Sequence, residues 1–336
     1  MANKVRMADI AQELGISVVS VSKGLAGKDG VSEEMRGKII ATAKRLGYVP
    51  AATPAAKATT ALNLTIGVLV ADRFFADNAF YSSLYRIVLM KSAALGCTVV
   101  LEIVSPENES ACRLPAILTS HRVDGLLLMG EINRDYIRAV AKTGLPMLLL
   151  DFYDSMLENS SVLSDNRAGG ERLTSHLLAH GCRKIGFVGS ILSTSSIMDR
   201  YLGYQAALYR AGIAARPDWR IEDRDENGRF VALRLPTEMP EAFLCSCDEV
   251  AYNLVEALVR AGYRVPKDVS VVGYDDYRFA TLCTPALTTY RVNVEEMGAV
   301  AVAQLLRRIR RKSYIHGSIL VRGGLIERES VRPLQK

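Results

Sequence analysis

The sequence of 336 residues lacks the features that would place it in several specialised classes. Its six cysteines include no Cys-x-x-Cys pair, so neither a disulfide framework nor a cysteine-based zinc site is indicated. No apolar run approaches the ~18 residues that a transmembrane helix requires. The N-terminal Met-Ala-Asn-Lys-Val-Arg has no apolar segment of an export signal. We therefore expect a cytoplasmic protein with reduced thiols and no membrane partner.

Signatures of catalysis and of cofactor binding are also missing. No apolar segment is followed by Gly-x-Gly-x-x-Gly, by a phosphate-binding P-loop or by Gly-x-Ser-x-Gly. His176 and His180 are four residues apart in an expected helix, but no glutamate motif and no third ligand accompany them. The sequence therefore predicts no enzyme activity, no cofactor and no metal site.

Positive charge is concentrated at the N-terminal end of the chain. The net charge is +6 and the isoelectric point is near 9.0. Residues 1–60 contain nine Lys and Arg against five Asp and Glu, whereas the other 276 residues contain 33 against 31. One fifth of the chain thus holds most of the excess charge. This distribution indicates that the N-terminal end meets a polyanion such as nucleic acid.

The first fifty residues show helical periodicity in three short segments. Apolar residues predict a first helix over 8–14, which Gly15 ends, and a second over 18–25, for which Ser17 is a suitable N-cap. Ser32, followed by two glutamates, begins a third helix that continues to Gly47. Two short helices joined across a glycine turn, with a third packed over them, form a helix-turn-helix unit. We expect this unit to span residues 1–48.

Residues 49–63 are rich in Ala, Pro and Thr and are expected to form a hinge or linker. From residue 64 to 336 apolar strands alternate with helical patterns, which is typical of doubly wound parallel α/β sheets in one large or two smaller domains. Before residue 242 a helix is replaced by a segment around Asn227-Gly228, where we expect a β-hairpin. Strands are predicted at 65–70, 98–103, 125–129, 147–150, 185–188, 242–245 and 269–272, and helices at 81–95, 109–120, 134–142, 168–180, 200–211, 248–261 and 294–310.

Several motifs along the whole chain resemble those of the lactose-repressor (LacI/GalR) family of bacterial regulators. They comprise the N-terminal stretch from Val5 to Glu34 with its closing Leu46-Gly-Tyr-Val-Pro, then Ile66-Gly-Val-Leu-Val, Val123-Asp-Gly-Leu-Leu, Asp165-Asn-x-x-Gly-Gly, Arg200-x-x-Gly-Tyr and Val271-Val-Gly-Tyr-Asp-Asp. The resemblance implies a headpiece, a hinge and a two-lobed core like a periplasmic sugar-binding protein. It also implies a homodimer that binds a palindromic operator, most often as a repressor, under control of a small sugar-like effector.

The second helix of the unit would enter the major groove of double-stranded DNA. Val18 and Val19 would contact thymine methyl groups, and Lys23 would donate to guanine. Ser17, Ser20 and Ser22 would bind phosphates. The alternative is that the valines are core residues of an ordinary three-helix bundle. Further DNA contacts are assigned to Arg6, Met7, Lys28 and Ser32, although lone charges such as Arg6 and Lys28 can equally be solvated.

The hinge departs from the family pattern. The resemblance implies a hinge leucine that enters the minor groove, and the matching position is Lys57, with Pro54 in the same segment. Lysine can enter a minor groove electrostatically but cannot unstack bases. We therefore expect either a smaller DNA kink or the use of Leu62 in its place.

The core is expected to bind its ligand at the carboxyl ends of the strands, between the lobes. Asp151 and Asp275 follow predicted strands, and Arg200 opens a predicted helix. Two carboxylates and a guanidinium suit paired hydroxyl groups. By resemblance the effector residues also include Phe80, Tyr81, Asn166 and Cys247, the last standing where the family commonly has asparagine. The alternative is that each charged residue is a surface or capping residue.

The resulting hypothesis is a DNA-binding transcription regulator. A sugar-binding protein without regulatory DNA binding and an α/β enzyme are the alternatives from other classes. Trp219, the single tryptophan, could stack on a sugar, but its place at the start of a short predicted strand favours packing at a sheet edge.

Overall fold

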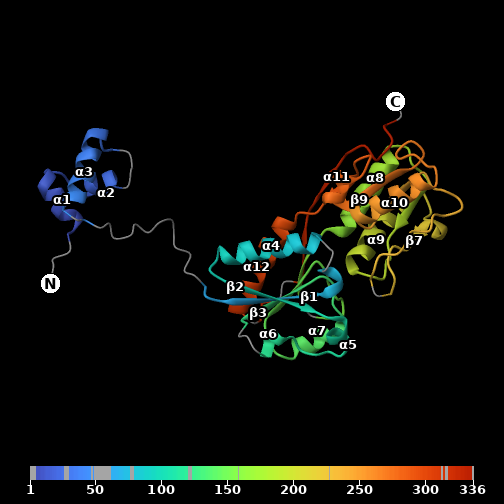
Figure 1. Ribbon diagram of the computed structural model, residues 1–336, viewed down its shortest axis with the longest axis horizontal. Helices are drawn as coiled ribbons and strands as arrows, with labels where there is room; N and C mark the ends of the chain where they lie inside the picture. Colours follow the sequence, from blue (N-terminus) through green and yellow to red (C-terminus); the bar gives the residue numbers. More distant parts are fainter. Residues whose placement is uncertain are drawn as a thin grey trace. The chain divides into compact units, whose positions relative to one another are not determined.

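The computed structural model describes residues 5–25, 30–46, 48, 62–75, 79–119, 123–157, 159–226, 228–311, 313–314 and 317–334. The chain divides into two units, Met1–Thr59 and Thr60–Lys336, which are described separately (Figure 1). Among the described residues no helix combines the length and the apolar character needed to cross a membrane.

The N-terminal unit consists of α1 (Met7–Leu14), α2 (Val18–Leu25) and α3 (Glu33–Arg45). Gly15 ends α1 in the left-handed conformation, with φ 62°, and its N–H donates to the last carbonyls of the helix. Ile10, Val21 and Ile39 contribute one side chain from each helix to a shared core and are fully buried. The three predicted helices are confirmed, and their arrangement is a helix-turn-helix.

The first lobe of the larger unit is built on a six-stranded, fully parallel sheet. The strand order is β11-β5-β4-β3-β1-β2. Strands β1, β3 and β4 are buried along most of their length because helices cover both faces, which explains their continuous apolar sequences. Helix α4 packs beside α12 on this lobe (Figure 1). The elements are β1 (Thr65–Ala71), η1 (Asp72–Phe74), α4 (Ala79–Ala93), β2 (Thr98–Val104), α5 (Pro106–Ser110), α6 (Ala116–Thr119), β3 (Gly125–Met129), α7 (Arg134–Ala141), β4 (Met147–Leu150), β5 (Ser160–Ser164), α12 (Val294–Arg310) and β11 (Ser318–Val321).

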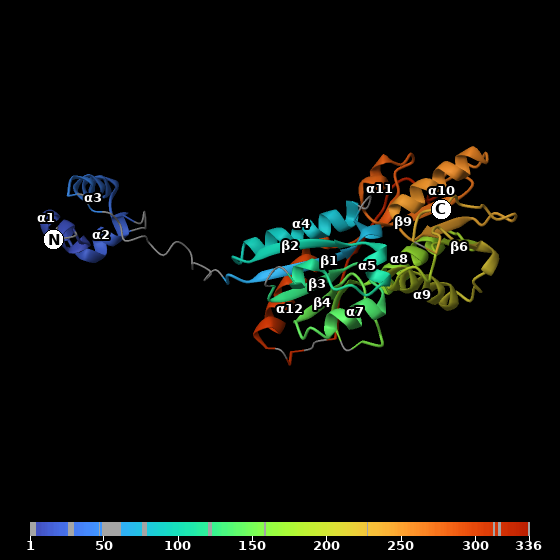
Figure 2. The same cartoon turned by 60° about the horizontal axis from the view of Figure 1, so that its bottom comes forward.

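The second lobe carries a second six-stranded sheet with the order β12-β10-β9-β8-β6-β7, in which only β12 runs antiparallel to its neighbour. Figure 2 shows the two lobes of this unit side by side, with α8 and α9 in the second lobe. The elements are α8 (Asn166–Ala179), β6 (Ile185–Val188), α9 (Ser195–Arg210), η2 (Pro217–Trp219), β7 (Arg220–Ile221), β8 (Ala242–Cys245), α10 (Asp248–Arg260), β9 (Ser270–Asp275), α11 (Arg278–Leu282), β10 (Thr288–Arg291) and β12 (Gly324–Ile326).

Two glycines allow α8 and α9 to pack with their backbones almost in contact. A Cβ on Gly170 would lie 2.2 Å from the carbonyl oxygen of Arg200, and one on Gly203 would lie 2.1 Å from that of Arg167. Only glycine fits at such a crossing. This close approach fixes Arg200 of α9 beside Asn166, the first residue of α8.

The predicted two-lobed core with parallel sheets is confirmed, but several elements differ from expectation. The helix predicted over 109–120 is wrong, because the chain forms two short helices there, α5 and α6. Helix α5 begins earlier than expected, since Ser105 caps it and Pro106 occupies its first turn. Helix α9 begins at Ser195, so Arg200 lies in its second turn rather than at its start. Strands β5, β10, β11 and β12 were not predicted, since each has at most five residues, and β5 and β10 are also rich in Ser or Thr.

The expected hairpin is present only as one antiparallel bridge between Arg224 and Phe230. The Asp225 N–H donates to the Arg229 carbonyl at 2.9 Å, and Asn227 lies outside the described residues. Trp219 is buried, its indole N–H donates to the Glu238 carbonyl at 2.9 Å, and the Arg216 guanidinium lies 4.4 Å from its ring. These contacts confirm the packing role expected for Trp219.

Candidate DNA-binding surface and effector cleft

The start of α2 presents an exposed apolar pair on the N-terminal unit. Val18 is 48% exposed and Val19 64% exposed, whereas Val21 of the same helix is fully buried. The alternative that Val18 and Val19 are core residues is therefore wrong. The two valines form an exposed apolar surface at the beginning of α2, and contact with a partner such as base edges would cover it.

Serines define the start of this helix. The Ser17 hydroxyl accepts a hydrogen bond from the Ser20 N–H at 3.1 Å and lies 2.9 Å from the Ser20 hydroxyl, so Ser17 caps α2 as predicted. Ser22 and Lys23 are exposed on the same helix. The N-terminal N–H groups of α2 and these polar side chains form a surface that suits phosphate.

The other residues assigned to DNA have mixed surroundings. The backbone N–H of Arg6 donates to Asp9 Oδ2 at 2.7 Å, and Arg6 itself is exposed. Met7 is half-buried against the core of the unit, and the exposed Ser32 caps α3 by accepting from the Met35 N–H. Lys28 and Lys57 lie outside the described residues.

Leu62, the hinge residue considered as a substitute for Lys57, is attached to the core. Its N–H donates to the Leu95 carbonyl at 3.2 Å, and its side chain packs against the main core cluster. In the structure Leu62 is therefore packed against the core of the larger unit.

A cleft with a volume of about 1650 Å³ lies between the two lobes of the larger unit. Residues at or just beyond the carboxyl ends of the strands line it from both lobes, as expected for an open parallel sheet. Asp72, Glu131 and Asp151 follow β1, β3 and β4, and Ser246 and Asp275 mark the ends of β8 and β9. Six of the seven predicted effector residues line this cleft, namely Phe80, Tyr81, Asp151, Arg200, Cys247 and Asp275.

Arg200 lines the cleft and is buried. Its Nε donates to Asn166 Oδ1 at 2.9 Å, and its Nη1 donates to the carbonyl of Ser246. Its Nη2 is 3.5 Å from Asp275 Oδ1, and its guanidinium lies 3.8 Å from the centre of the Tyr274 ring. Asn166, the seventh predicted residue, thus holds the arginine rather than lining the cleft.

Asp151 contributes an oxygen that has no partner in the described structure. Its Oδ2 accepts from the Tyr81 hydroxyl at 2.9 Å, while its buried Oδ1 accepts no hydrogen bond. The residue has φ 68°, and Asp275 has φ 106°, so both carboxylates occupy backbone conformations that are strained for residues with a Cβ. Such strain is characteristic of functional positions.

Burial raises the pKa values of two carboxyl groups and of one thiol in the cleft. Burial raises the pKa of Asp151 to about 6, and the attraction of Arg200 only partly offsets this. Burial likewise raises the pKa of Asp275 to about 7, although Arg200 acts to lower it. Burial also raises the pKa of the Cys247 thiol to about 12, so this cysteine is a neutral thiol in the cleft.

Phe80 and Tyr81 form an aromatic corner at the start of α4. Their rings are 5.2 Å apart and nearly perpendicular, and the Tyr81 ring also lies 5.1 Å from that of Phe74. Since Tyr81 also donates to Asp151, the corner both walls the cleft and orients that carboxylate.

Several residues of the cleft were not predicted. Glu131 Oε2 accepts from the Ser195 N–H at 2.6 Å, which links the first lobe to the start of α9 in the second. Arg73 forms an ion pair with Glu109 at 2.5 Å. Glu131 and Arg73 both follow predicted strands, so the rule that placed Asp151 and Asp275 would have found them.

Asp248 and Asp223 support the second lobe side of the cleft. Asp248 is buried and accepts from the Thr289 hydroxyl at 2.6 Å and from the Tyr277 N–H at 2.7 Å. Asp223 accepts from the Ser190 N–H and the Ser246 hydroxyl, both at 2.7 Å. These carboxylates fix the strand ends around the cleft.

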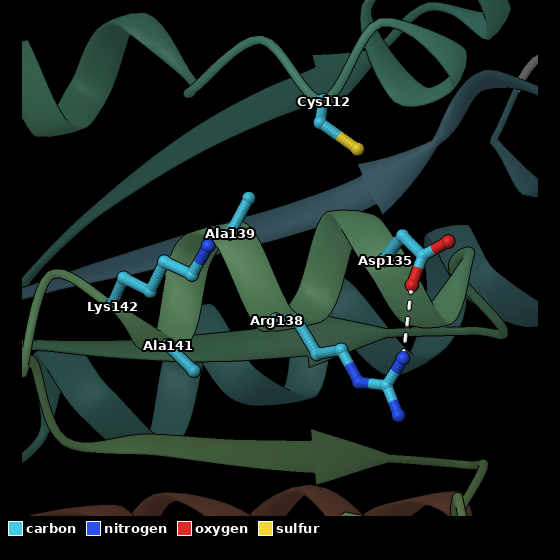
Figure 3. A pocket seen from close by; sticks show the side chains of 6 residues that line it. All are labelled: Cys112, Asp135, Arg138, Ala139, Ala141 and Lys142. Carbon is cyan, nitrogen blue, oxygen red and sulfur yellow. Dashed lines mark hydrogen bonds and ion pairs between the residues drawn. The ribbon is translucent and has the colours of Figure 1, made fainter.

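A second hollow lies over α7 (Figure 3). The one ion pair drawn in the figure joins Arg138 to Asp135 at 3.1 Å, on the exposed face of α7. It brings no buried polar groups together, unlike the cleft. The residues that line it are Cys112, Asp135, Arg138, Ala139, Ala141 and Lys142.

A helix-turn-helix unit followed by a two-lobed core with a cleft between its lobes defines the class of ligand-responsive DNA-binding regulators. Residues 6–51 match the family described as bacterial regulatory proteins, lacI family, and residues 174–331 match the periplasmic binding protein-like domain. The chain is 31% identical to the HTH-type transcriptional repressor PurR of Pectobacterium carotovorum subsp. carotovorum, over 96% of each chain. The chain therefore belongs to the LacI family of bacterial regulatory proteins.

Solved structures agree with this assignment. The lac repressor dimer bound to operator and the anti-inducer ONPF has a TM-score of 0.68 and 26% identity, with 98% of this chain and 100% of that chain covered. A LacI family transcriptional regulator from Enterococcus faecium with bound ribose has a TM-score of 0.66 and 25% identity, with 81% and 100% covered. The chain is thus a DNA-binding transcription regulator rather than an enzyme, and it acts in the bacterial cytoplasm, where the DNA lies.

Proposed function

We propose that this protein represses transcription as a homodimer that binds a palindromic operator, and that a small sugar-like effector in the cleft controls its operator affinity. The lac repressor structure, a dimer on its operator, supports the assembly, and the ribose-bound relative supports the type of effector. Two headpieces on one dimer would meet two half-sites related by the same symmetry.

In this proposal the exposed face of α2 reads the operator. Val18 and Val19 would cover thymine methyl groups, and Lys23 would donate to guanine N7 and O6. Ser17, Ser20 and Ser22 would bind backbone phosphates and fix the register. The exposure of the two valines supports this part of the proposal.

The observation that carries the effector site is the buried group around Arg200. The guanidinium is held by Asn166 and Asp275, and the free Oδ1 of Asp151 lies at the same cleft. A sugar can donate a hydroxyl hydrogen to each carboxylate and accept from the arginine. The cleft lies between the lobes, so a bound ligand would stabilise one arrangement of the lobes over another. It would thereby shift the dimer between a DNA-competent state and a released state.

The test is fluorescence anisotropy on labelled DNA from the region upstream of the gene, at fixed salt, since phosphate contacts make affinity salt-dependent. Tight, palindrome-specific binding that one sugar relieves would support the proposal. Weak binding that is independent of sequence and of every added sugar would contradict it.

A further inference from the structure

We infer that the effector carries no phosphate or carboxylate group, and that the cleft accepts an uncharged sugar or an amino sugar while excluding sugar phosphates. This inference rests on the proposed function, since it concerns the ligand of the same cleft. It is based on the charges that line the cleft, on the pairing of its arginines and on the free oxygen of Asp151.

The cleft is acidic although the chain as a whole is basic. In the part of the chain that the structure describes, the lining side chains include twelve carboxylates and six arginines, and no lysine. The whole chain has a net charge of +6. A ligand in the cleft therefore meets an excess of negative groups, although the protein as a whole is positively charged.

Five of the six arginines that line the cleft are paired with carboxylates. Arg73 pairs with Glu109 through two hydrogen bonds of 2.5 and 3.1 Å, and its second nitrogen also donates to the Glu131 carbonyl. Arg134 pairs with Asp154 at 2.5 Å. These guanidinium groups would have to leave their partners before they could bind a phosphate.

The same holds on the second lobe. Arg224 pairs with Asp223 at 2.5 Å, and Arg220 with Glu222 at 3.2 Å. Arg200 is buried, donates to Asn166 and to a backbone carbonyl, and lies 3.5 Å from Asp275, so a ligand that accepts from it also lies beside that carboxylate. The sixth arginine, Arg229, is exposed at the turn before Phe230. Phosphate recognition by proteins relies on guanidinium, lysine or backbone N–H groups that point at the ligand, and the paired arginines of the cleft are not arranged in this way.

The free oxygen of Asp151 specifies what the ligand must supply. Asp151 is 4% exposed, its Oδ1 accepts no hydrogen bond, and the residue lines the cleft. A buried acceptor without a donor is costly, and a ligand hydroxyl or ammonium group would satisfy it. A phosphate oxygen is itself an acceptor and would be repelled.

The experiment compares probes that differ only in the phosphate. The full chain is titrated with D-ribose and D-ribose 5-phosphate, D-glucose and D-glucose 6-phosphate, and D-glucosamine and D-glucosamine 6-phosphate. Thermal unfolding, followed by the fluorescence of Trp219, and release of labelled operator are measured. Within a pair, the unphosphorylated probe is expected to act at a concentration at least about 100-fold lower. The reason is that the negative charge of a phosphate is repelled by the buried carboxylates of the cleft.

The outcomes separate this inference from the proposed function. If a phosphorylated probe releases the operator more effectively than its partner, the regulator stands and the charge inference is wrong. If no unphosphorylated probe stabilises the chain, the inference is also wrong. If the chain does not bind its operator, the proposed function fails, whereas the thermal measurements still decide the charge of the ligand.

A charge variant gives a second test that needs no effector. In the double variant Asp151→Asn and Asp275→Asn, Arg200 loses both nearby carboxylates, and inorganic phosphate is expected to raise the melting temperature of the core. The control is Asp218→Asn with Asp268→Asn, which makes the same change of net charge outside the cleft. Equal stabilisation of the unaltered protein by phosphate, or no gain in the double variant, would overturn the inference.

Discussion

Replacing Asp275 by asparagine is expected to reduce the loss of core stability between pH 5 and pH 8 by roughly 2 to 3 kcal/mol. The carboxyl group is buried, and its pKa in the folded state is raised to about 7 from the ordinary 3.8. Folding therefore favours the protonated form. The stability that this group contributes is fully present below pH 3.8 and is lost as the pH rises through 7.

The size of the effect follows from the two pKa values. A folded-state pKa of about 7 against 3.8 in the unfolded chain corresponds to about 4 kcal/mol over the full pH range. The part that falls between pH 5 and 8 is roughly 2 to 3 kcal/mol. Asp151, with a pKa of about 6, adds about 1 kcal/mol over the same range. Asp275→Asn keeps the contribution of Asp151, and it should therefore lose roughly 2 to 3 kcal/mol less stability over this range than the unaltered protein.

The assay is urea unfolding at pH 5 and pH 8, followed by the fluorescence of Trp219, which is buried in the same lobe as Asp275. Asp268→Asn is the matched control. Hydrogen bonds from Arg264 lower the pKa of Asp268 to about 2, below the range of the experiment. An equal loss of stability in Asp275→Asn and in the unaltered protein would refute the reasoning.

Three further substitutions test other parts of the structure. Lys23→Ala is expected to weaken specific operator binding by ~1–3 kcal/mol and to reduce the discrimination between bases at one operator position. The control Lys44→Ala should have little effect on sequence preference. Anisotropy on operators with single-base changes measures both variants. Gly203→Ala should destabilise the core by about 3 kcal/mol, because the new Cβ would meet the Arg167 carbonyl at 2.1 Å; an unchanged melting temperature would contradict the close helix crossing. Gly37→Ala should stabilise the headpiece by about 1 kcal/mol, since nothing lies within 4 Å of the new Cβ in α3, and a lower melting temperature by circular dichroism would argue against this.

The fold was predictable from the sequence where apolar runs are long and bounded. Strands β3, β4, β6 and β8 occupy the predicted residues because central parallel strands are buried on both faces and therefore read as continuous apolar segments. Strand β5 has the sequence Ser-Ser-Val-Leu-Ser and is equally buried. The hydroxyl of Ser161 finds its partner only in the tertiary structure, since it donates to Ser318 of β11 at 2.7 Å. Composition alone gave no signal for it.

The site was predictable in part, for a similar reason. The carboxyl ends of strands identified Asp151 and Asp275, and the resemblance identified Arg200. Neither could show that Asn166 holds Arg200 from α8, because that contact depends on the crossing of two helices at Gly170 and Gly203. Three of the arginine–carboxylate pairs of the cleft likewise depend on side chains that are distant in sequence, namely Arg73 with Glu109, Arg134 with Asp154 and Arg200 with Asp275.

The central claim is that a ligand bound at Arg200 and Asp275 controls operator affinity, and it is tested most directly by separating the two functions. Anisotropy of labelled operator is measured for the unaltered protein and for Asp275→Ala, at fixed salt, with increasing concentrations of the sugar that acts on the unaltered protein. The account predicts equal operator affinity without sugar, and release of the operator by the sugar only from the unaltered protein. Release of the variant at the same sugar concentration would contradict it.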